Sequence, residues 1–187
     1  MTKLRIKSLL AGGLCLALAV FSGAAPAAAE DPQAVAQKVY AQIKSDLSVG
    51  LSNALVDEHF DTHIMAAQAL GEPFRGFSAE QQTAYVQAFD TYFKKALYRV
   101  LTAYKDVTLS DLNSKVEGNR AVIRCAVKPA GSDAVNLALN LSLAQGTWKA
   151  NDVSVENISL VRSYRPQFGS LYKQSGFDGL VEFLKSH

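Results

Sequence analysis

The spacing of hydrophobic residues changes after Lys105, and this change limits the folds that the chain can adopt. Before it, Val35, Val39 and Ile43 recur every four residues, which is typical of a helix with one buried face. After it, apolar and polar residues alternate, most clearly in residues 135–143, which predicts a half-buried antiparallel strand. The order is helices, then strands, then helices. We therefore predict an α+β fold with helices packed on one face of a curved antiparallel sheet.

Local signals set the expected boundaries of these elements. The helix signals are an N-cap and proline at Asp31-Pro32, a C-cap at Gly71 and a capping box at Ser78 and Gln81. Helices are expected from Pro32 onward, over about 53–70 and 78–104, from 159–163 to Gly176, and briefly after Gly176. Turns are expected at 116–119 and 145–146, where glycine separates alternating segments.

The first 29 residues have the pattern of a secretory signal peptide. Lys3, Arg5 and Lys7 form a positive start, residues 9–21 form an apolar segment, and residues 27–29 are alanines. The apolar segment is too short to span a bilayer. We expect cleavage after Ala29, export to the periplasm, and one domain formed by residues 30–187.

Charge and cysteine content exclude several classes of protein. The chain has 19 Lys and Arg against 17 Asp and Glu, and three of the basic residues precede Ala29, which leaves 16 against 17 after cleavage. Nucleic-acid binding needs a basic face, so we expect no nucleic-acid partner. Cys125 alone remains after cleavage, so no internal disulfide can form and a packed core must stabilise the fold.

No group of residues matches a catalytic motif. His59 and His63 are four apart and would share one helical face, but Phe60 stands where an HExxH zinc motif has Glu. A solvated polar face is the favoured interpretation of this pair. Cys125 lies on the apolar face of an expected strand, where a thiol acts as a small hydrophobic side chain. We expect no catalytic residues, no metal and no cofactor.

The last third of the chain has a distinctive order of apolar, aromatic and glycine residues. It comprises Trp148, Asp152-Val153, Val155, Ile158 to Val161, Tyr164-Arg165, Phe168, Gly176 to Leu180 and Leu184. This order resembles the closing segment of the MlaC family, also called toluene-tolerance (Ttg2-type) proteins. Weaker matches extend upstream: Phe60-Asp61, Met65-Ala66, Leu70-Gly71, Phe74-Arg75, Phe89 and Tyr104.

Two positions depart from the family pattern. Asn157 stands where the family commonly has Gly, and Pro166 lies at the start of the closing helix. Asn enters the left-handed backbone region more easily than most residues, and Pro is tolerated in a first helical turn. We therefore expect both residues to be compatible with the family fold.

The resemblance implies a periplasmic carrier that moves phospholipid between the outer membrane and an inner-membrane ABC transporter, maintaining outer-membrane lipid asymmetry. The implied partners are phospholipid as cargo, the ABC transporter complex and an outer-membrane lipoprotein/porin complex. We expect a monomer. Transport of hopanoids or other lipids, a small hydrolase or isomerase of a helix-on-curved-sheet type, and an adaptor with a solid core remain alternatives.

A soluble carrier must enclose the lipid tails, so we expect an apolar cavity between the sheet and the helices. The expected lining comprises Phe89, Phe93, Leu97, Val100, Leu137, Leu139, Leu141, Trp148, Val153, Val155, Leu160, Tyr164 and Phe168. Arg75 and Arg165 are the expected contacts for the lipid head group at the rim, with a structural ion pair as the alternative role of each. A filled core would show the same apolar pattern.

Overall fold

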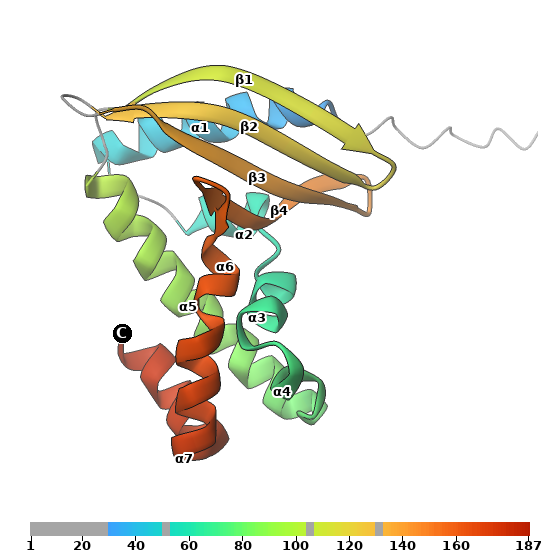
Figure 1. The fold of residues 1–187 in the computed structure, drawn as a ribbon, viewed down its shortest axis with the longest axis vertical. Helices are drawn as coiled ribbons and strands as arrows, with labels where there is room; N and C mark the ends of the chain where they lie inside the picture. The colour runs from blue at the N-terminus through green and yellow to red at the C-terminus, as the bar shows by residue number, and fades with distance from the viewer. Residues whose placement is uncertain (1–29, 50–52, 104–106, 130–132) are drawn as a thin grey trace, which may run out of the picture.

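The computed structural model describes residues 30–49, 53–103, 107–129 and 133–187 (Figure 1). The elements are α1 (Pro32–Val49), α2 (Ala54–His59), α3 (Thr62–Leu70), α4 (Glu72–Arg75), α5 (Ala79–Ala103), β1 (Val107–Glu117), β2 (Arg120–Pro129), β3 (Val135–Ala144), β4 (Thr147–Val155), β5 (Ile158–Ser159), α6 (Leu160–Ser163) and α7 (Arg165–Ser186). The helices in these ranges include none that is long and apolar enough to cross a membrane. The predicted signal peptide lies outside the described residues.

The five strands form one antiparallel sheet in the order β1-β2-β3-β4-β5. Tight turns connect β2 to β1 and β4 to β3, as the glycines at 118 and 146 predict. The last hairpin turns at Glu156 and Asn157, with φ of 48° and 66°. Both values lie in the left-handed region that short hairpin turns require, and Asn157 adopts it in place of glycine.

One face of the sheet points toward the helices. Ile123, Leu139 and Val153 are direct neighbours across β2, β3 and β4, and Cys125, Leu137 and Val155 form the next row. Arg120 and Arg124 are exposed on the opposite face. The predicted alternation in β2 and β3 is therefore confirmed, and the α+β prediction with it.

A β-bulge in β4 changes which of its residues face inward. Leu141 pairs with Ala150 and Asn140 pairs with Asp152, so Asn151 is an extra residue in β4. Because one residue is added, Trp148 and Ala150 face the same side as Val153 and Val155. Asp152 is buried, and its Oδ1 accepts a hydrogen bond from the Val161 N–H at 3.4 Å, which joins β4 to the start of α6.

Two hydrophobic clusters lie on the helix-covered side of the sheet. The sheet cluster, between α1 and the strands, comprises Val35, Val39, Leu55, Ala121, Ile123, Leu141 and Trp148. The helix cluster comprises Val56, Phe60, Met65, Ala66, Ala69, Leu70, Phe74, Phe77, Tyr85, Ala88, Phe89, Phe93, Ala150, Val161, Phe168, Leu180, Val181 and Leu184. Figure 1 shows α1 along the sheet and α3, α4, α5 and α7 gathered farther from it.

Side-chain caps set the predicted starts of two helices. The Gln33 N–H donates to Asp31 Oδ1 at 3.1 Å at the start of α1. At the start of α5, the Gln81 N–H donates to Ser78 Oγ at 3.2 Å while the Ser78 N–H donates to Gln81 Oε1 at 3.1 Å. This reciprocal pair is the predicted capping box.

The prediction of one helix over 53–70 is wrong. Phe60 has an extended backbone, with φ −119° and ψ 143°, and bridges in parallel to Ala150 of β4. Asp61 then caps a new helix by accepting a hydrogen bond from the Ile64 N–H at 3.0 Å. Since the helix is broken between them, His59 and His63 do not share a helical face.

The closing helix follows the prediction, and the short helix α6 is added before it. Ser159 caps the short α6, and Pro166 lies in the first turn of α7. Gly176 has φ 66° and ψ −167°, which interrupts α7. The last segment, 177–186, turns back beside α5, and Lys95 Nζ donates to the Lys185 carbonyl at 3.0 Å (Figure 1).

We expect Gly176→Ala to lower the free energy of unfolding by about 1–3 kcal/mol, because this backbone region is almost restricted to glycine. Gly169→Ala is the matched control in the same helix. A Cβ there meets open space in an ordinary helical turn, so it should stabilise by about 0.5–1 kcal/mol. Urea unfolding of both variants is the measurement. A Gly176→Ala protein at least as stable as wild type would contradict the strain at this kink.

Candidate functional site

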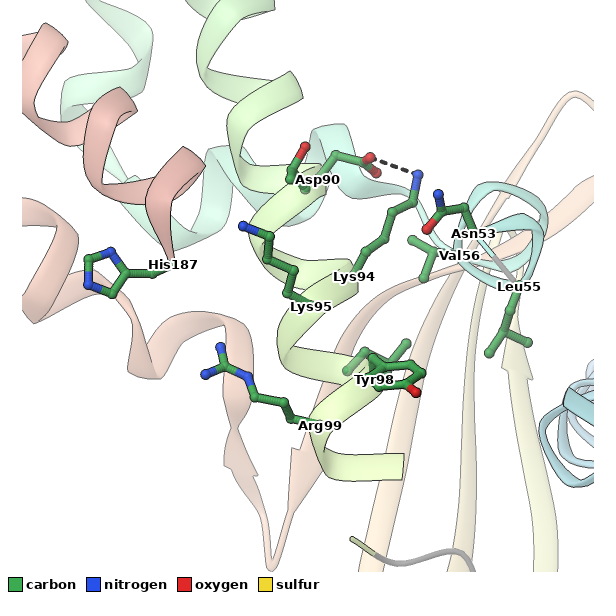
Figure 2. A pocket seen from close by; sticks show the side chains of 11 residues that line it. Asn53, Leu55, Val56, Asp90, Lys94, Lys95, Tyr98, Arg99 and His187 are labelled. Atoms are coloured by element: carbon green, nitrogen blue, oxygen red, sulfur yellow. Dashed lines mark ion pairs between the residues drawn. The ribbon is translucent and has the colours of Figure 1, made fainter. Parts of the chain in front are cut away.

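A pocket of about 570 Å³ opens beside the C-terminal half of α5 (Figure 2). Its lining comprises Asn53, Leu55, Val56, Asp90, Thr91, Lys94, Lys95, Leu97, Tyr98, Arg99 and His187. Leu55 and Val56 are buried and form its floor with the half-buried Leu97. The polar lining residues extend from this floor across the exposed face of α5 to His187. The volume is within the range of about 300–1,000 Å³ found for small-molecule sites.

The floor of the pocket lies where the two hydrophobic clusters meet. Leu55 belongs to the sheet cluster and Val56 to the helix cluster, although they are adjacent in α2. Leu139 of β3 packs against both clusters. An apolar group entering between Leu55, Val56 and Leu97 would therefore reach the boundary between two packed cores.

The short helix α2 is held in place by contacts with β4. The Asp61 N–H donates to the Ala150 carbonyl at 2.8 Å, and Lys149 Nζ donates to the Asp57 carbonyl at 3.0 Å. On the other side, His59 Nε2 lies 3.1 Å from Gln42 Oε1 of α1. These contacts fix the pair of residues that forms the pocket floor.

Lys94 is neutralised by two carboxylates at the rim. Its Nζ lies 2.5 Å from Asp57 Oδ1 and 2.8 Å from Asp90 Oδ2. Burial alone would lower the pKa of Lys94, but hydrogen bonds with Asp57 and Asp90 outweigh it and raise the pKa. Lys94 is therefore charged and already partnered.

Arg99 differs from the other cations of the rim. Lys95 donates to the Lys185 carbonyl, whereas the Arg99 guanidinium has no hydrogen bond or ion pair with any residue that the structure describes. Figure 2 shows Lys95 and Arg99 leaving α5 on the side of His187, and Lys94 and Tyr98 on the side of α2. Burial and the neighbouring Tyr92 raise the pKa of Tyr164, and Arg99 partly offsets the rise, so Arg99 also acts on the start of α7.

The predicted aromatic lining residues lie in the helix cluster. Phe89 and Phe168 are fully buried with ring centroids 6.4 Å apart, Phe93 stacks on Phe89 at 6.1 Å, and Tyr164 stacks on Phe168 at 5.2 Å. These rings fill the space between α5 and α7. They are core contacts in this conformation, and they do not line the 570 Å³ pocket.

The sheet residues that were predicted to line the lipid cavity lie in different parts of the structure. Leu139 and Val153 pack against the helix cluster, and Leu141 and Trp148 are buried in the sheet cluster, against α1. Leu137 lines a second, smaller hollow of about 360 Å³ and pairs with the half-buried Val155. Leu160 is 40% exposed. The side chain of Val100 lies outside what the structure describes, so Leu97 is the predicted residue found at the larger pocket.

The two predicted rim arginines lie elsewhere. Arg75 is highly exposed, with its Nη1 3.4 Å from Glu72 Oε2. Arg165 donates to the Gln68 carbonyl from Nε at 3.3 Å and from Nη2 at 3.0 Å, which ties α7 to the end of α3. Neither lines the pocket at α5.

Sequence reasoning missed Leu55, Val56 and the cations of α5. The expected helix over 53–70 hid the short α2, whose adjacent apolar residues serve two different cores. From the sequence, no role was assigned to Lys94, Lys95 or Arg99. The spacing of four between Lys95 and Arg99 was the available signal, because residues at this spacing share one side of a helix.

The described residues contain no group of three or more His, Cys, Asp or Glu side chains placed to hold a metal. His63 is exposed and packs edge-on against Phe74, while His59 faces Gln42. Cys125 is buried, and burial raises the pKa of its thiol, which disfavours the reactive thiolate.

The fold and the pocket define a helix-on-sheet protein with a ligand-sized pocket over an apolar floor. A model of the MlaC protein family matches residues 29–186, and the chain belongs to this family. A phospholipid-binding protein from Ralstonia solanacearum, solved in complex with a phospholipid, has a similar structure, with a TM-score of 0.69. The match covers 84% of this chain and 96% of that chain at 22% sequence identity, so the likeness concerns the fold.

We expect acid to weaken the anchoring of α2 through His59. Burial lowers the pKa of His59, and Glu58, 3.9 Å away, offsets this only in part. The unfolded chain therefore binds the proton more readily than the folded one. The stability that this neutral His59 contributes is complete above its ordinary pKa of 6.5 and is lost as the pH falls below it.

Urea unfolding between pH 7.5 and 5 measures this effect, with pH values chosen around the ordinary His pKa of about 6.5. His59→Gln should lose less stability on acidification than wild type, and the exposed His63→Gln should follow wild type. Equal pH dependence of His59→Gln and wild type would show that His59 does not cause the change.

Proposed function

We propose that the protein is a periplasmic phospholipid carrier whose lipid tails enter between the sheet cluster and the helix cluster. The observation that carries this proposal is the pocket at α5, whose floor of Leu55, Val56 and Leu97 lies on the boundary between the two clusters. The MlaC family and the phospholipid held by the similar Ralstonia solanacearum protein support the choice of cargo.

The cost of exposing a lipid tail to water explains why such a carrier needs an interior site. Each buried methylene is worth about 0.8 kcal/mol, so a tail of about sixteen carbons would cost on the order of 12 kcal/mol in water. Contact with an open surface leaves much of that cost in place. Insertion along a boundary between two cores removes the tail from water without breaking either core.

The lipid enters without covalent chemistry. The tails lie between the two clusters, lined by Leu97 and, deeper, by Leu139 and Val153. The phosphate stays near water at the polar rim. Loading separates α5 from the sheet side, and the two clusters close again when the lipid leaves.

The remaining parts of the proposal concern location and partners. Residues 1–29 direct export to the periplasm, and residues 30–187 form the lipid-binding domain. The carrier exchanges phospholipid with an outer-membrane lipoprotein/porin complex and an inner-membrane ABC transporter, which maintains outer-membrane lipid asymmetry. It acts as a monomer. A hydrolase would need convergent polar groups around a reacting bond, and the rim of this pocket pairs its carboxylates with Lys94.

Leu97→Trp should fill the space over the pocket floor and reduce the phospholipid that the protein retains. Protein purified from the periplasm without detergent is extracted with organic solvent, and the lipid is quantified by mass spectrometry. Wild type should carry stoichiometric phospholipid and Leu97→Trp less than a fifth of it, because a blocked pocket leaves about 12 kcal/mol of tail hydration cost unrelieved.

Leu171→Trp is the control, since Leu171 also packs partly buried against the helix cluster but does not line the pocket. It should retain lipid as wild type does. Wild-type protein free of lipid would refute the carrier function. Full lipid retention by Leu97→Trp, with both variants folded, would refute this pocket as the entrance.

A further inference from the structure

Lys94 joins α5 to α2 beside the pocket floor. Its Nζ lies 2.5 Å from Asp57 Oδ1 of α2 and 2.8 Å from Asp90 Oδ2 of α5 itself. Figure 2 shows Lys94 leaving α5 on the side of α2, where Leu55 and Val56 form the floor. The ammonium is therefore shared between one carboxylate on each of the two helices that border the floor.

Asp57 is fixed to the sheet through the backbone around it. The Asp57 carbonyl accepts a hydrogen bond from Lys149 Nζ of β4 at 3.0 Å. A few residues later, the Asp61 N–H donates to the Ala150 carbonyl of the same strand at 2.8 Å. The ion pair between Asp57 and Lys94 therefore connects α5 to the sheet side of the molecule.

Two other hydrogen bonds of α5 lead to α3 and α7. Tyr85 Oη donates to the Ala66 carbonyl of α3 at 3.3 Å, and Lys95 Nζ donates to the Lys185 carbonyl of α7 at 3.0 Å. Neither bond involves α2. When α5 separates from α2, these two bonds can stay in place, but the ion pair to α2 must break.

Asp90 lowers the cost of breaking this ion pair. It lies four residues before Lys94 on the same helix, so it stays beside the ammonium when α5 moves. The Lys94 side chain is only 17% exposed, and without a carboxylate beside it the charge would be costly to keep there. The Asp57 side chain is 58% exposed and returns readily to water. The contact between α5 and α2 is therefore reversible.

We propose that the ion pair between Lys94 and Asp57 is a latch that holds the empty carrier closed, so that it opposes lipid entry and favours lipid release. This inference rests on the proposed carrier function and specifies how its site is controlled. In the closed protein the latch is formed. In the loaded protein α5 has left α2, and Lys94 keeps Asp90 alone. Removing the latch therefore shifts the equilibrium toward the loaded protein.

The test is the partition of phospholipid between the protein and vesicles. Protein stripped of cargo is incubated with phosphatidylglycerol vesicles below saturation and separated from them, and its lipid is quantified by mass spectrometry. Asp57→Asn keeps the shape of the side chain and the carbonyl that binds Lys149. It should raise the partition of lipid into the protein about fivefold, which corresponds to an ion pair worth about 1 kcal/mol.

Asp90→Asn is the matched control, because it removes the same charge from beside the same ammonium but leaves the latch. It should not raise the partition of lipid into the protein. Added salt screens the latch, so it should raise uptake by wild type toward that of Asp57→Asn, whose own uptake should change little. Urea unfolding midpoints close to wild type show that each variant is folded.

A crosslink tests directly whether α5 must leave α2. The double variant Asp57→Cys with Lys94→Cys is joined by a short, cleavable bis-thiol reagent. It should take up little lipid until the reagent is cleaved. Wild type treated in the same way controls for reaction at Cys125, which is buried.

Each outcome supports or overturns a stated claim. Equal partition into Asp57→Asn and wild type, or the same increase in Asp90→Asn, overturns the latch and leaves the carrier function standing. Full lipid uptake by the crosslinked protein also overturns it, because α5 would then not need to leave α2. Wild type that takes up no lipid would instead refute the carrier function itself.

Discussion

The structure depends on one apolar sheet face being shared by two groups of helices. α1 covers part of this face and builds the sheet cluster, while α5, α6 and α7 belong to the helix cluster on the same side. Leu139 contacts both clusters, and the adjacent Leu55 and Val56 of α2 divide between them. The pocket at α5 is lined by residues of both clusters.

The charged side chains of the pocket lie at its rim. The pocket floor is apolar, so a tail that covers it leaves no buried polar group without a hydrogen-bond partner. At the rim, carboxylates neutralise Lys94, the end of α7 engages Lys95, and Arg99 stays free among the described residues. An amphipathic ligand fits this order because its uncharged part meets the floor and its charged part stays at the polar rim. Neither step requires a nucleophile or a metal.

Much of the fold could be predicted from the sequence, since its signals are local. The alternation in β2 and β3, the caps at Asp31 and Ser78, and the left-handed turn at Asn157 each depend on a few neighbouring residues. The break at Phe60 and the bulge at Asn151 could not, because both follow from pairing between distant segments. The same holds for the site. Apolar periodicity places Phe89 and Leu97 on one helix, but only side-chain packing decides that Phe89 fills a core and Leu97 lines a pocket.

Photo-crosslinking tests most directly whether tails lie at the boundary between the two clusters. A phosphatidylglycerol with a diazirine near the end of one acyl chain is loaded from vesicles, irradiated, and mapped by peptide mass spectrometry. The account predicts adducts on peptides that contain the pocket floor or the shared sheet residues, Leu55-Val56, Leu97, Leu139 or Val153. Adducts confined to the exposed Val116 or Ile158, or to the outer face at Arg120 and Arg124, would contradict it, because the tail would then lie on the surface.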